Sequence, residues 1–464
     1  MTWSRVDGFP DVREADPLAP ADLPAETPEQ RWRRMPVRGD GVVFVKFASG
    51  PKNHHAPSAT QTIYVGVSLM NRPNLFVSDD GGATWSAVPG EPAAYRPTRA
   101  ALSSDGFLYV AYGTAPGPSR MTGGAVWKLN TRTGAWTDST PDRPAAGSRE
   151  FGYAAVSVDA KHPNALIAST YGRPGGDDIF RSTDGGATWK PIFASGGVLD
   201  YRLAPYVKPT PIHWLFDIEI DPADSNHAVF TTGYGGWETF DLGAADRGQP
   251  THWTILTEGI EETVPLDLDS PGGGAHLISG IGDYGGFVHW TLDRPALDGS
   301  SAPPRMSNTT AVASAALRPQ VLVRVGIGAG RNRDENIGYS LDGGTTWKAT
   351  AASPQAGSRA GTVAVSADGE VWVWTPEHET ASVTHDRGST WHTVQGLPPG
   401  VRAIADPVNP HLFYGVDLAG KMLYRSTDNG SIFTALGFML PKILNPYDPL
   451  TRGDERGGQD QIYA

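Results

Sequence analysis

The sequence predicts an all-β protein of short strands, and three observations lead to this prediction. Glycine (56 residues) and proline (39 residues) are frequent among the 464 residues, and such a content interrupts helices and marks many turns. Between the turns lie short runs rich in β-branched and aromatic residues, such as TIYVGVS, GFLYVAYG, HAVFTTGYG and EVWVWTP. One turn motif recurs between these runs, and the 14 Trp and 15 Tyr make the chain too aromatic to be disordered.

The recurring turn motif has the consensus S/T-x-D-x-G-x-T-W. Its five copies start at Ser78, Ser182, Ser340, Thr384 and Ser426. The pattern is that of a hairpin turn, in which the Asp accepts hydrogen bonds from turn N–H groups and the Gly adopts a positive φ. The first hydroxyl is expected to brace the Asp, and the Trp to pack back against the hairpin. We therefore predict that the motif is structural and indicates a fold rather than a reaction.

The spacing of the motif predicts the architecture. From Ser340 to Thr384 is 44 residues, and from Thr384 to Ser426 is 42. A period in the forties with four strands per unit is typical of β-propeller blades. Eight to nine blade-like units fit along the chain, which favours tandem β-propellers over one ring. We predict that residues 1–250 form part of a first β-propeller and residues 251–464 most of a second.

Composition narrows the function classes. The net charge of −12 argues against nucleic acid as a partner, because phosphates would be repelled. The absence of cysteine excludes disulfides, thiolate zinc sites and Cys nucleophiles. No apolar stretch is long enough to span a membrane, and the N-terminus lacks the basic and apolar regions of a signal peptide. The segment PEHET (376–380) offers one His without an evident third ligand, so we predict neither a metal nor a cofactor.

One glycine-rich segment, HLISGIGDYGGFVHW (276–290), allows several interpretations. Its residues 280–285 fit the G-x-G-x-x-G spacing of a dinucleotide-binding turn. That interpretation needs a helix directly after the glycines, whereas the residues that follow are β-branched and aromatic and end at Pro295. The segment also places one carboxylate, Asp283, in a bend between two apolar runs. Either Asp283 caps its own turn, or a strand end presents it as an acid.

Across nearly its whole length the chain resembles glycoside hydrolase family 74, the xyloglucan-cleaving endoglucanases built from two seven-bladed β-propellers around a cleft. The matching stretches include GGAVWKLNTRTGAWTDSTP, DDIFRSTDGGATWKPI, FDIEIDPADSNHAVFTTGYG and GIEETVPLDLDSPGGGAHLISGIGDYGGFVH. The GIEET and GDYGGF segments, in that order, are more specific than the Asp-box turns, which sialidases share. The resemblance implies an inverting glycoside hydrolase acting on a β-1,4-glucan of the xyloglucan type, located outside the cell or in the periplasm.

The resemblance implies that Asp283 is the general acid, because it stands at the aspartate of the family's G-D-x-G-G-F motif. The glycines at 280, 282, 285 and 286 would let a sugar approach the strand end closely. Partial desolvation of Asp283 would keep its carboxyl protonated for donation to the leaving oxygen. Gly285 and Gly286 are thus expected to line the substrate site.

Inversion requires a second carboxylate that activates water. In the family it lies in an N-terminal T-D-I-G-G-A-Y-R-like segment, which this sequence lacks, so the general base is expected to be missing from the chain. Both propellers are expected to be incomplete, which would favour self-association through unpaired strand edges. The other carboxylates considered as substitutes are Glu261, Glu262, Asp217, Glu219 and Asp267. Alternation in FDIEIDP favours Asp217 and Glu219 on the polar face of a strand.

Aromatic side chains are the expected sugar platforms, because the C–H groups of glucose stack on π surfaces. The candidates are Tyr284, Tyr234, Trp237 and Trp214. Trp372 and Trp374 alternate in EVWVWTP and face one side, either core or cleft. At residues 171–178 the chain lacks the tandem Trp that many family members carry. The alternative to an enzyme is a non-catalytic propeller module that binds a glycan or a protein.

Overall fold

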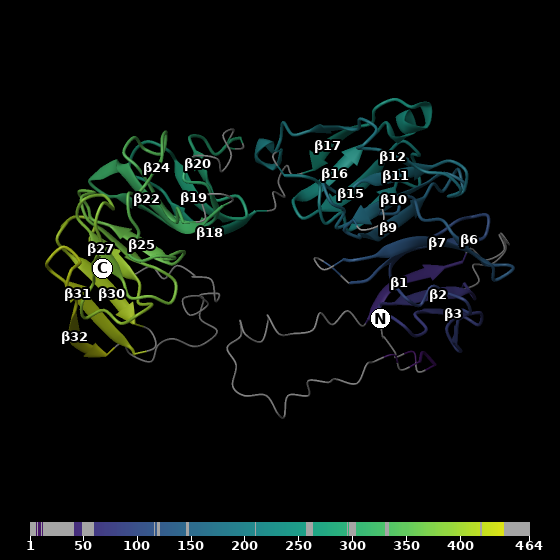
Figure 1. Ribbon diagram of the computed structural model, residues 1–464, viewed down its shortest axis with the longest axis horizontal. Coiled ribbons are helices and arrows are strands. Elements are labelled where there is room, and N and C mark those ends of the chain that lie inside the picture. The colour runs from purple at the N-terminus through teal and green to yellow at the C-terminus, as the bar shows by residue number, and fades with distance from the viewer. Residues whose placement is uncertain are drawn as a thin grey trace. The chain divides into compact units, whose positions relative to one another are not determined.

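The computed structural model describes residues 41–48, 60–115, 121–144, 148–208, 210–256, 263–294, 303–329, 334–417 and 420–439, together with residues 6, 8–10, 12, 117 and 296. These residues form eight β-sheets and two short 3-10 helices (Figure 1). The chain divides into two compact units. The first comprises Met1–Leu203 and Lys208–Glu261, and the second comprises Ala204–Val207 and Glu262–Ala464.

The first unit holds four sheets, each built from strands that follow one another in the chain. Their strands are β1 (Val42–Phe47), β2 (Ile63–Val67), β3 (Leu75–Ser78) and β4 (Ser86–Ala87); β5 (Arg96–Leu102), β6 (Phe107–Gly113), β7 (Gly124–Asn130) and β8 (Trp136–Asp138); β9 (Gly152–Val158), β10 (Leu166–Tyr171), β11 (Ile179–Ser182) and β12 (Lys190–Pro191); and β13 (Val198–Asp200), β14 (Asp217–Ile220), β15 (Ala228–Thr232), β16 (Gly235–Thr239) and β17 (His252–Leu256). The 3-10 helix η3 (Leu242–Arg247) precedes β17.

The second unit also holds four sheets in the described residues. Their strands are β18 (Val264–Asp269), β19 (Leu277–Gly282) and β20 (Phe287–His289); β21 (Met306–Ala315), β22 (Arg318–Gly328), β23 (Ile337–Ser340) and β24 (Lys348–Ala349); β25 (Thr362–Val365), β26 (Trp372–Thr375), β27 (Ser382–Thr384) and β28 (His392–Thr393); and β29 (Ala403–Ala405), β30 (Phe413–Asp417), β31 (Met422–Ser426) and β32 (Thr434–Met439). The 3-10 helix η2 (Pro205–Val207) belongs to this unit.

Within each unit the sheets stack face to face and share apolar cores. One core lies between the sheets β1–β4 and β5–β8 and includes Phe44, Leu75 and Leu108. Another lies between β21–β24 and β25–β28 and buries Trp372 and Trp374 completely. Middle strands such as β10 and β26 are buried along their whole length, because a sheet covers them on each side. This assigns Trp372 and Trp374, for which the sequence allowed core or cleft, to the core.

The five copies of the turn motif each connect the third and fourth strands of a sheet. In the second copy the Ser182 hydroxyl donates to Asp184 (2.8 Å) and accepts from the N–H of Gly186 (2.9 Å). Asp184 in turn accepts from the N–H (2.9 Å) and the hydroxyl (2.5 Å) of Thr188. The side chain of Thr188 is the largest of the contacts that lower the pKa of Asp184 to about 2. These contacts confirm the turn chemistry predicted from the motif.

The all-β class and the propeller-type architecture predicted from the sequence are confirmed. The number of blades in each ring stays a prediction, as does the assignment of 1–250 and 251–464 to two propellers. The strand β17, which follows residue 250, pairs with β16 and completes the last sheet of the first unit.

Candidate functional site

Asp283 lies in the second unit, directly after the end of β19. Its side chain is exposed, and its backbone adopts a left-handed conformation with φ of 65°. The side-chain oxygen of Asn308 accepts a hydrogen bond from the Asp283 N–H (2.9 Å), and the carbonyl of Ser307 accepts one from the N–H of Gly285 (3.2 Å). Strand β21 therefore holds the turn in place from the side, and the turn presents the carboxyl outward.

The glycines of this turn have a role inside the sheet. A Cβ on Gly286 would lie 2.0 Å from the carbonyl oxygen of Ser279, and one on Gly280 would lie 2.7 Å from that of Thr309. Gly285 and Gly286 are buried and have positive φ angles of 74° and 125°. Close backbone packing thus requires glycine at positions 280 and 286, and the contact of Gly285 and Gly286 with a sugar stays a prediction.

The dinucleotide interpretation of residues 280–285 is wrong. The residues after Gly286 form strand β20, which pairs antiparallel with β19. No helix N-terminus follows the glycines to hold a pyrophosphate.

Tyr284 is buried beside the acid. Its ring packs edge-on against Tyr206 of η2, with ring centroids 5.1 Å apart, and Tyr206 also contacts Phe287 (5.2 Å). The rings of Tyr206, Tyr284 and Phe287 thus pack together and support the turn. The exposed fraction of Tyr284 is 6%, so its ring supports the turn more than it offers a stacking surface.

In the first unit, Trp214 is the most accessible of the predicted sugar platforms. It is 38% exposed, and its ring packs edge-on against His213, which packs in the same way against Tyr234 (5.2 and 4.8 Å between centroids). The side chains of two loops, residues 213–214 and 233–234, therefore form one aromatic cluster. Trp214 also has a positive φ of 54°, a conformation that is unusual for a bulky residue.

The structure does not support the prediction that Trp237 is a sugar platform. It was predicted to contact sugar, but it is 1% exposed and packs against Phe230 and Tyr201 in the core of its sheet. Trp237 lies on β16, where successive side chains point to opposite faces of the sheet. Neighbouring segments cover the face on which Trp237 lies. Trp237 therefore has no free face for stacking.

The other candidate carboxylates have structural partners. Asp217 pairs with Arg99 (3.1 Å), and Glu219 accepts from the hydroxyl of Ser157 (2.7 Å). Both lie on the more exposed face of β14, as the alternation predicted. Asp267 is buried, accepts from the N–H of Val312 (2.8 Å), and has its pKa raised to about 6 by desolvation. Glu261 and Glu262 lie outside the described residues.

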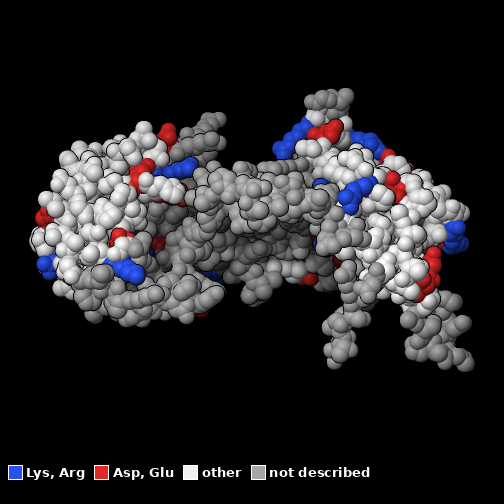
Figure 2. Space-filling model, turned by 90° about the horizontal axis from the view of Figure 1, so that it is seen from below, with Lys and Arg blue, Asp and Glu red and all other residues white. Residues whose placement is uncertain are grey.

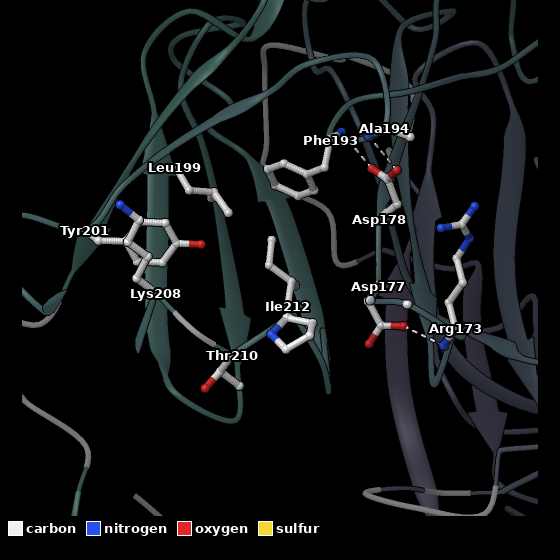
Figure 3. A pocket seen from close by; sticks show the side chains of 13 residues that line it. Arg173, Asp177, Asp178, Phe193, Ala194, Leu199, Tyr201, Lys208, Thr210 and Ile212 are labelled. Carbon is white, nitrogen blue, oxygen red and sulfur yellow. Dashed lines mark hydrogen bonds between the residues drawn. The ribbon is translucent and has the colours of Figure 1, made fainter. Parts of the chain in front are cut away.

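A cavity of about 460 Å³ in the first unit was not foreseen (Figure 3). Its lining comes from four parts of the chain: Arg173 with residues 175–178, residues 193–194, Leu199 with Tyr201, and Lys208 with residues 210–212. Burial raises the pKa of one lining carboxyl, that of Asp177, to about 6. The sequence carries no signal for this cavity, because its walls are up to about forty residues apart and come together only in the fold.

In the described part of the chain, no group of three or more His, Asp or Glu side chains is placed to hold a metal ion. The described residues also contain no helix of the length and apolarity that a membrane span requires.

Comparison with known proteins shows which molecules this fold resembles. A family profile described as BNR/Asp-box repeat matches residues 76–87 and 180–191, which contain the first two copies of the turn motif. A xyloglucanase from Paenibacillus sp is 36% identical over 456 residues, which cover 93% of this chain and 43% of that protein. A xyloglucanase from Acetivibrio thermocellus is 36% identical over 467 residues, covering 96% of this chain and 53% of that protein.

Among solved structures, the GH74 xyloglucanase from Xanthomonas campestris matches with a TM-score of 0.80 and 41% identity, covering 86% of this chain and 56% of that one. The chain thus spans about half the length of the relatives it matches. The fold and repeats define an all-β, propeller-type protein with Asp-box turns. Within that class, the chain is similar, over about half of their length, to xyloglucanases, among them one of glycoside hydrolase family 74, which confirms the resemblance found in the sequence.

Proposed function

We propose that the chain provides the general acid of an inverting glycoside hydrolase that cleaves xyloglucan, and that Asp283 is this acid. The observation that carries the proposal is the geometry of the turn after β19. An exposed carboxyl stands at a strand end, on a left-handed backbone whose N–H is held by Asn308. The similarity to xyloglucanases supports the substrate.

The surface is compatible with an uncharged polysaccharide. On the face seen in Figure 2, the described Lys and Arg side chains are interspersed with Asp, Glu and uncharged atoms. A neutral glycan is recognised by hydroxyl hydrogen bonds and aromatic stacking, and it needs no field of a single sign. Trp214, supported by His213, is the side chain that we propose as a stacking platform.

Inversion also needs a base about 6.5–9.5 Å from the acid, with water between them. This base is expected to be missing from the chain, and that stays a prediction. Asp267 is a poor substitute, because it is buried and accepts hydrogen bonds from the N–H groups of Val312 and Leu268. We also propose an extracellular or periplasmic location.

The test is the Asp283→Asn substitution, which keeps the shape of the side chain and tolerates the left-handed backbone. In a protein that also supplies the general base, reducing-end release from xyloglucan should fall about 10²–10⁴-fold, as expected for loss of a general acid. The control is Asp224→Asn, in a turn where Asp224 accepts from the N–H of Asn226 (3.0 Å).

Equal hydrolysis by the Asp283→Asn variant and the unaltered chain would refute the acid assignment. Xyloglucan binding without hydrolysis, even when the general base is supplied, would favour the alternative, a non-catalytic glycan-binding module. Binding can be followed by calorimetry in both proteins.

A further inference from the structure

The cavity of the first unit has the features of a ligand site. Its volume of about 460 Å³ lies within the range of about 300–1,000 Å³ that small-molecule sites occupy. Figure 3 shows Tyr201, Thr210 and the apolar Leu199 on one side, Asp177 on the opposite side, and the apolar side chain of Ile212 between them. Polar groups on opposed walls with an apolar surface between them suit a flat ligand whose edge is polar.

Asp177 is the acceptor on its wall. It is 4% exposed, and its Oδ1 accepts hydrogen bonds from the N–H of Arg173 (2.9 Å) and the hydroxyl of Thr170 (3.3 Å). Its Oδ2 accepts a long hydrogen bond of 3.4 Å from the N–H of Leu215. Because a carboxylate has about four lone-pair sites, Oδ2 retains capacity for a hydroxyl donated by a ligand.

The neighbouring Asp178 has a structural role. Its two oxygens accept from the N–H groups of Ile179 (2.8 Å), Phe193 (2.8 Å) and Ala194 (3.0 Å). These bonds tie together two of the segments that line the cavity. They hold the wall in shape and occupy the carboxylate, so Asp177 is the acid that faces a ligand.

The opposite wall supplies donors on a rigid support. The ring of Tyr201 packs edge-on against the buried Trp237, with centroids 5.2 Å apart, and its hydroxyl is directed into the cavity (Figure 3). Thr210 and Lys208 add a hydroxyl and an ammonium group. A ligand would therefore meet side chains that packing has already placed.

The charges of the lining favour a neutral ligand. The guanidinium of Arg173 lies 3.5 Å from the carboxylate of Asp142, which is outside the cavity lining. Lys208 then faces the two carboxylates of Asp177 and Asp178, so the lining carries no excess of positive charge. A polyanion would meet the carboxylates of Asp177 and Asp178, whereas a neutral ring with several hydroxyls finds both donors and acceptors.

We infer that this cavity binds one neutral pyranose that is joined to the rest of a glycan by a single glycosidic bond. The hydroxyls of the sugar meet Asp177, Tyr201 and Thr210, and its C–H face lies over Leu199 and Ile212. Such a sugar is either a branch or a chain end. The inference rests on the proposed function, because xyloglucan hydrolysis defines the glycan, and it adds a recognition site on residues that are not part of the Asp283 turn.

The experiment measures binding by calorimetry in the Asp283→Asn background, so that the probe survives. The probes are a xylose-branched oligosaccharide of xyloglucan and a linear cello-oligosaccharide with the same backbone length. The double substitution Tyr201→Phe and Thr210→Val removes two hydroxyls at almost constant volume. It should weaken binding about 10-fold, as expected for two lost hydrogen bonds. The matched control is Tyr414→Phe with Thr434→Val, on β30 and β32.

Selective weakening of the branched probe assigns the cavity to a branch, and weakening of both probes assigns it to a chain end. Affinity for both probes that is unchanged by the double substitution overturns the inference. Absence of binding of either probe to the protein with the unaltered cavity overturns it as well. A second variant, Thr210→Trp, fills the cavity and should abolish the same binding while denaturation shows an intact fold. The acid assignment is tested separately by the hydrolysis assay, and it fails if the Asp283→Asn protein still hydrolyses xyloglucan.

Discussion

At the residue scale, Asp283 depends on a neighbour for its position. Its left-handed backbone is tolerated because Asp is among the few residues that visit this region routinely, and Asn308 on β21 accepts its N–H. Among the described residues, the hydrogen bond of Asp283 is made by its backbone N–H and not by its carboxyl. This favours the acid interpretation over that of an Asp that caps its own turn, and the role of Asp283 stays a proposal.

Replacement of Asn308 tests this positioning role. In Asn308→Ala the N–H of Asp283 loses its acceptor, and the carboxyl should lose its fixed direction. We expect kcat on xyloglucan to fall about 10-fold, because misplacement of a catalytic group by about 1 Å is costly, while KM stays close to that of the unaltered protein. Initial-rate kinetics measure both quantities. Asn409→Ala, in a turn of the last sheet, is the control, and an unchanged kcat in Asn308→Ala would contradict the role.

The burial of Asp177 predicts that the stability of the fold depends on pH. Burial raises its pKa from the ordinary value of 3.8 to about 6, so the folded state binds its proton more tightly than the unfolded state does. Its contribution to stability is therefore fully present below about pH 4 and is lost as the pH rises through about 6. The loss amounts to about 3 kcal/mol, since each pKa unit corresponds to about 1.4 kcal/mol.

The Asp177→Asn variant cannot ionise and should escape this loss. Its free energy of unfolding relative to that of the unaltered protein should rise by about 3 kcal/mol between pH 4 and pH 7. Urea unfolding at several pH values measures the difference. A relative stability that does not change with pH would show that the carboxyl of Asp177 has an ordinary environment.

At the element scale, the Asp-box turns hold the outer hairpins together. Ser182 is 2% exposed, and its hydroxyl serves both the carboxyl of Asp184 and the N–H of Gly186. The same arrangement recurs at Ser78, Ser340 and Ser426, and with a threonine at Thr384. Because the turn satisfies its own polar groups, its conformation follows from local sequence.

The Ser182→Ala substitution should therefore destabilise the fold. It leaves the buried N–H of Gly186 without its acceptor, at a cost of about 1–3 kcal/mol. The neighbouring Thr183→Ala, at an exposed position, should stay within about 0.5 kcal/mol of the unaltered protein. Urea unfolding of both variants makes the comparison, and equal stabilities would show that the hydroxyl of Ser182 does not support the turn.

At the scale of the whole molecule, stacked sheets bury the middle strands of each unit but leave apolar side chains exposed on β1, the first strand of its sheet. On β1, Val45 is 44% exposed and Phe47 is 62% exposed. The self-association expected from the sequence stays a prediction, and these side chains support it, because an exposed apolar strand edge favours pairing with another chain.

Light scattering across a concentration series tests the self-association. The unaltered protein should form dimers or larger species, and Val45→Lys with Phe47→Lys should weaken that association at least about 10-fold, since charge on an edge strand opposes pairing. Val408→Lys, at another exposed apolar position, is the control. A concentration-independent monomer would contradict the prediction.

The sequence by itself determined the all-β class, the Asp-box turns and the position of Asp283 at a strand end, because each depends on residues within about ten positions of one another. Only the tertiary structure decided which aromatic side chains are accessible: Trp237, Trp372 and Trp374 lie in cores, whereas Trp214 is exposed. The cavity around Asp177 is likewise formed only by the tertiary structure. Burial and cavities are properties of segments that are distant in the chain, and local patterns carry no information about which segments will cover them.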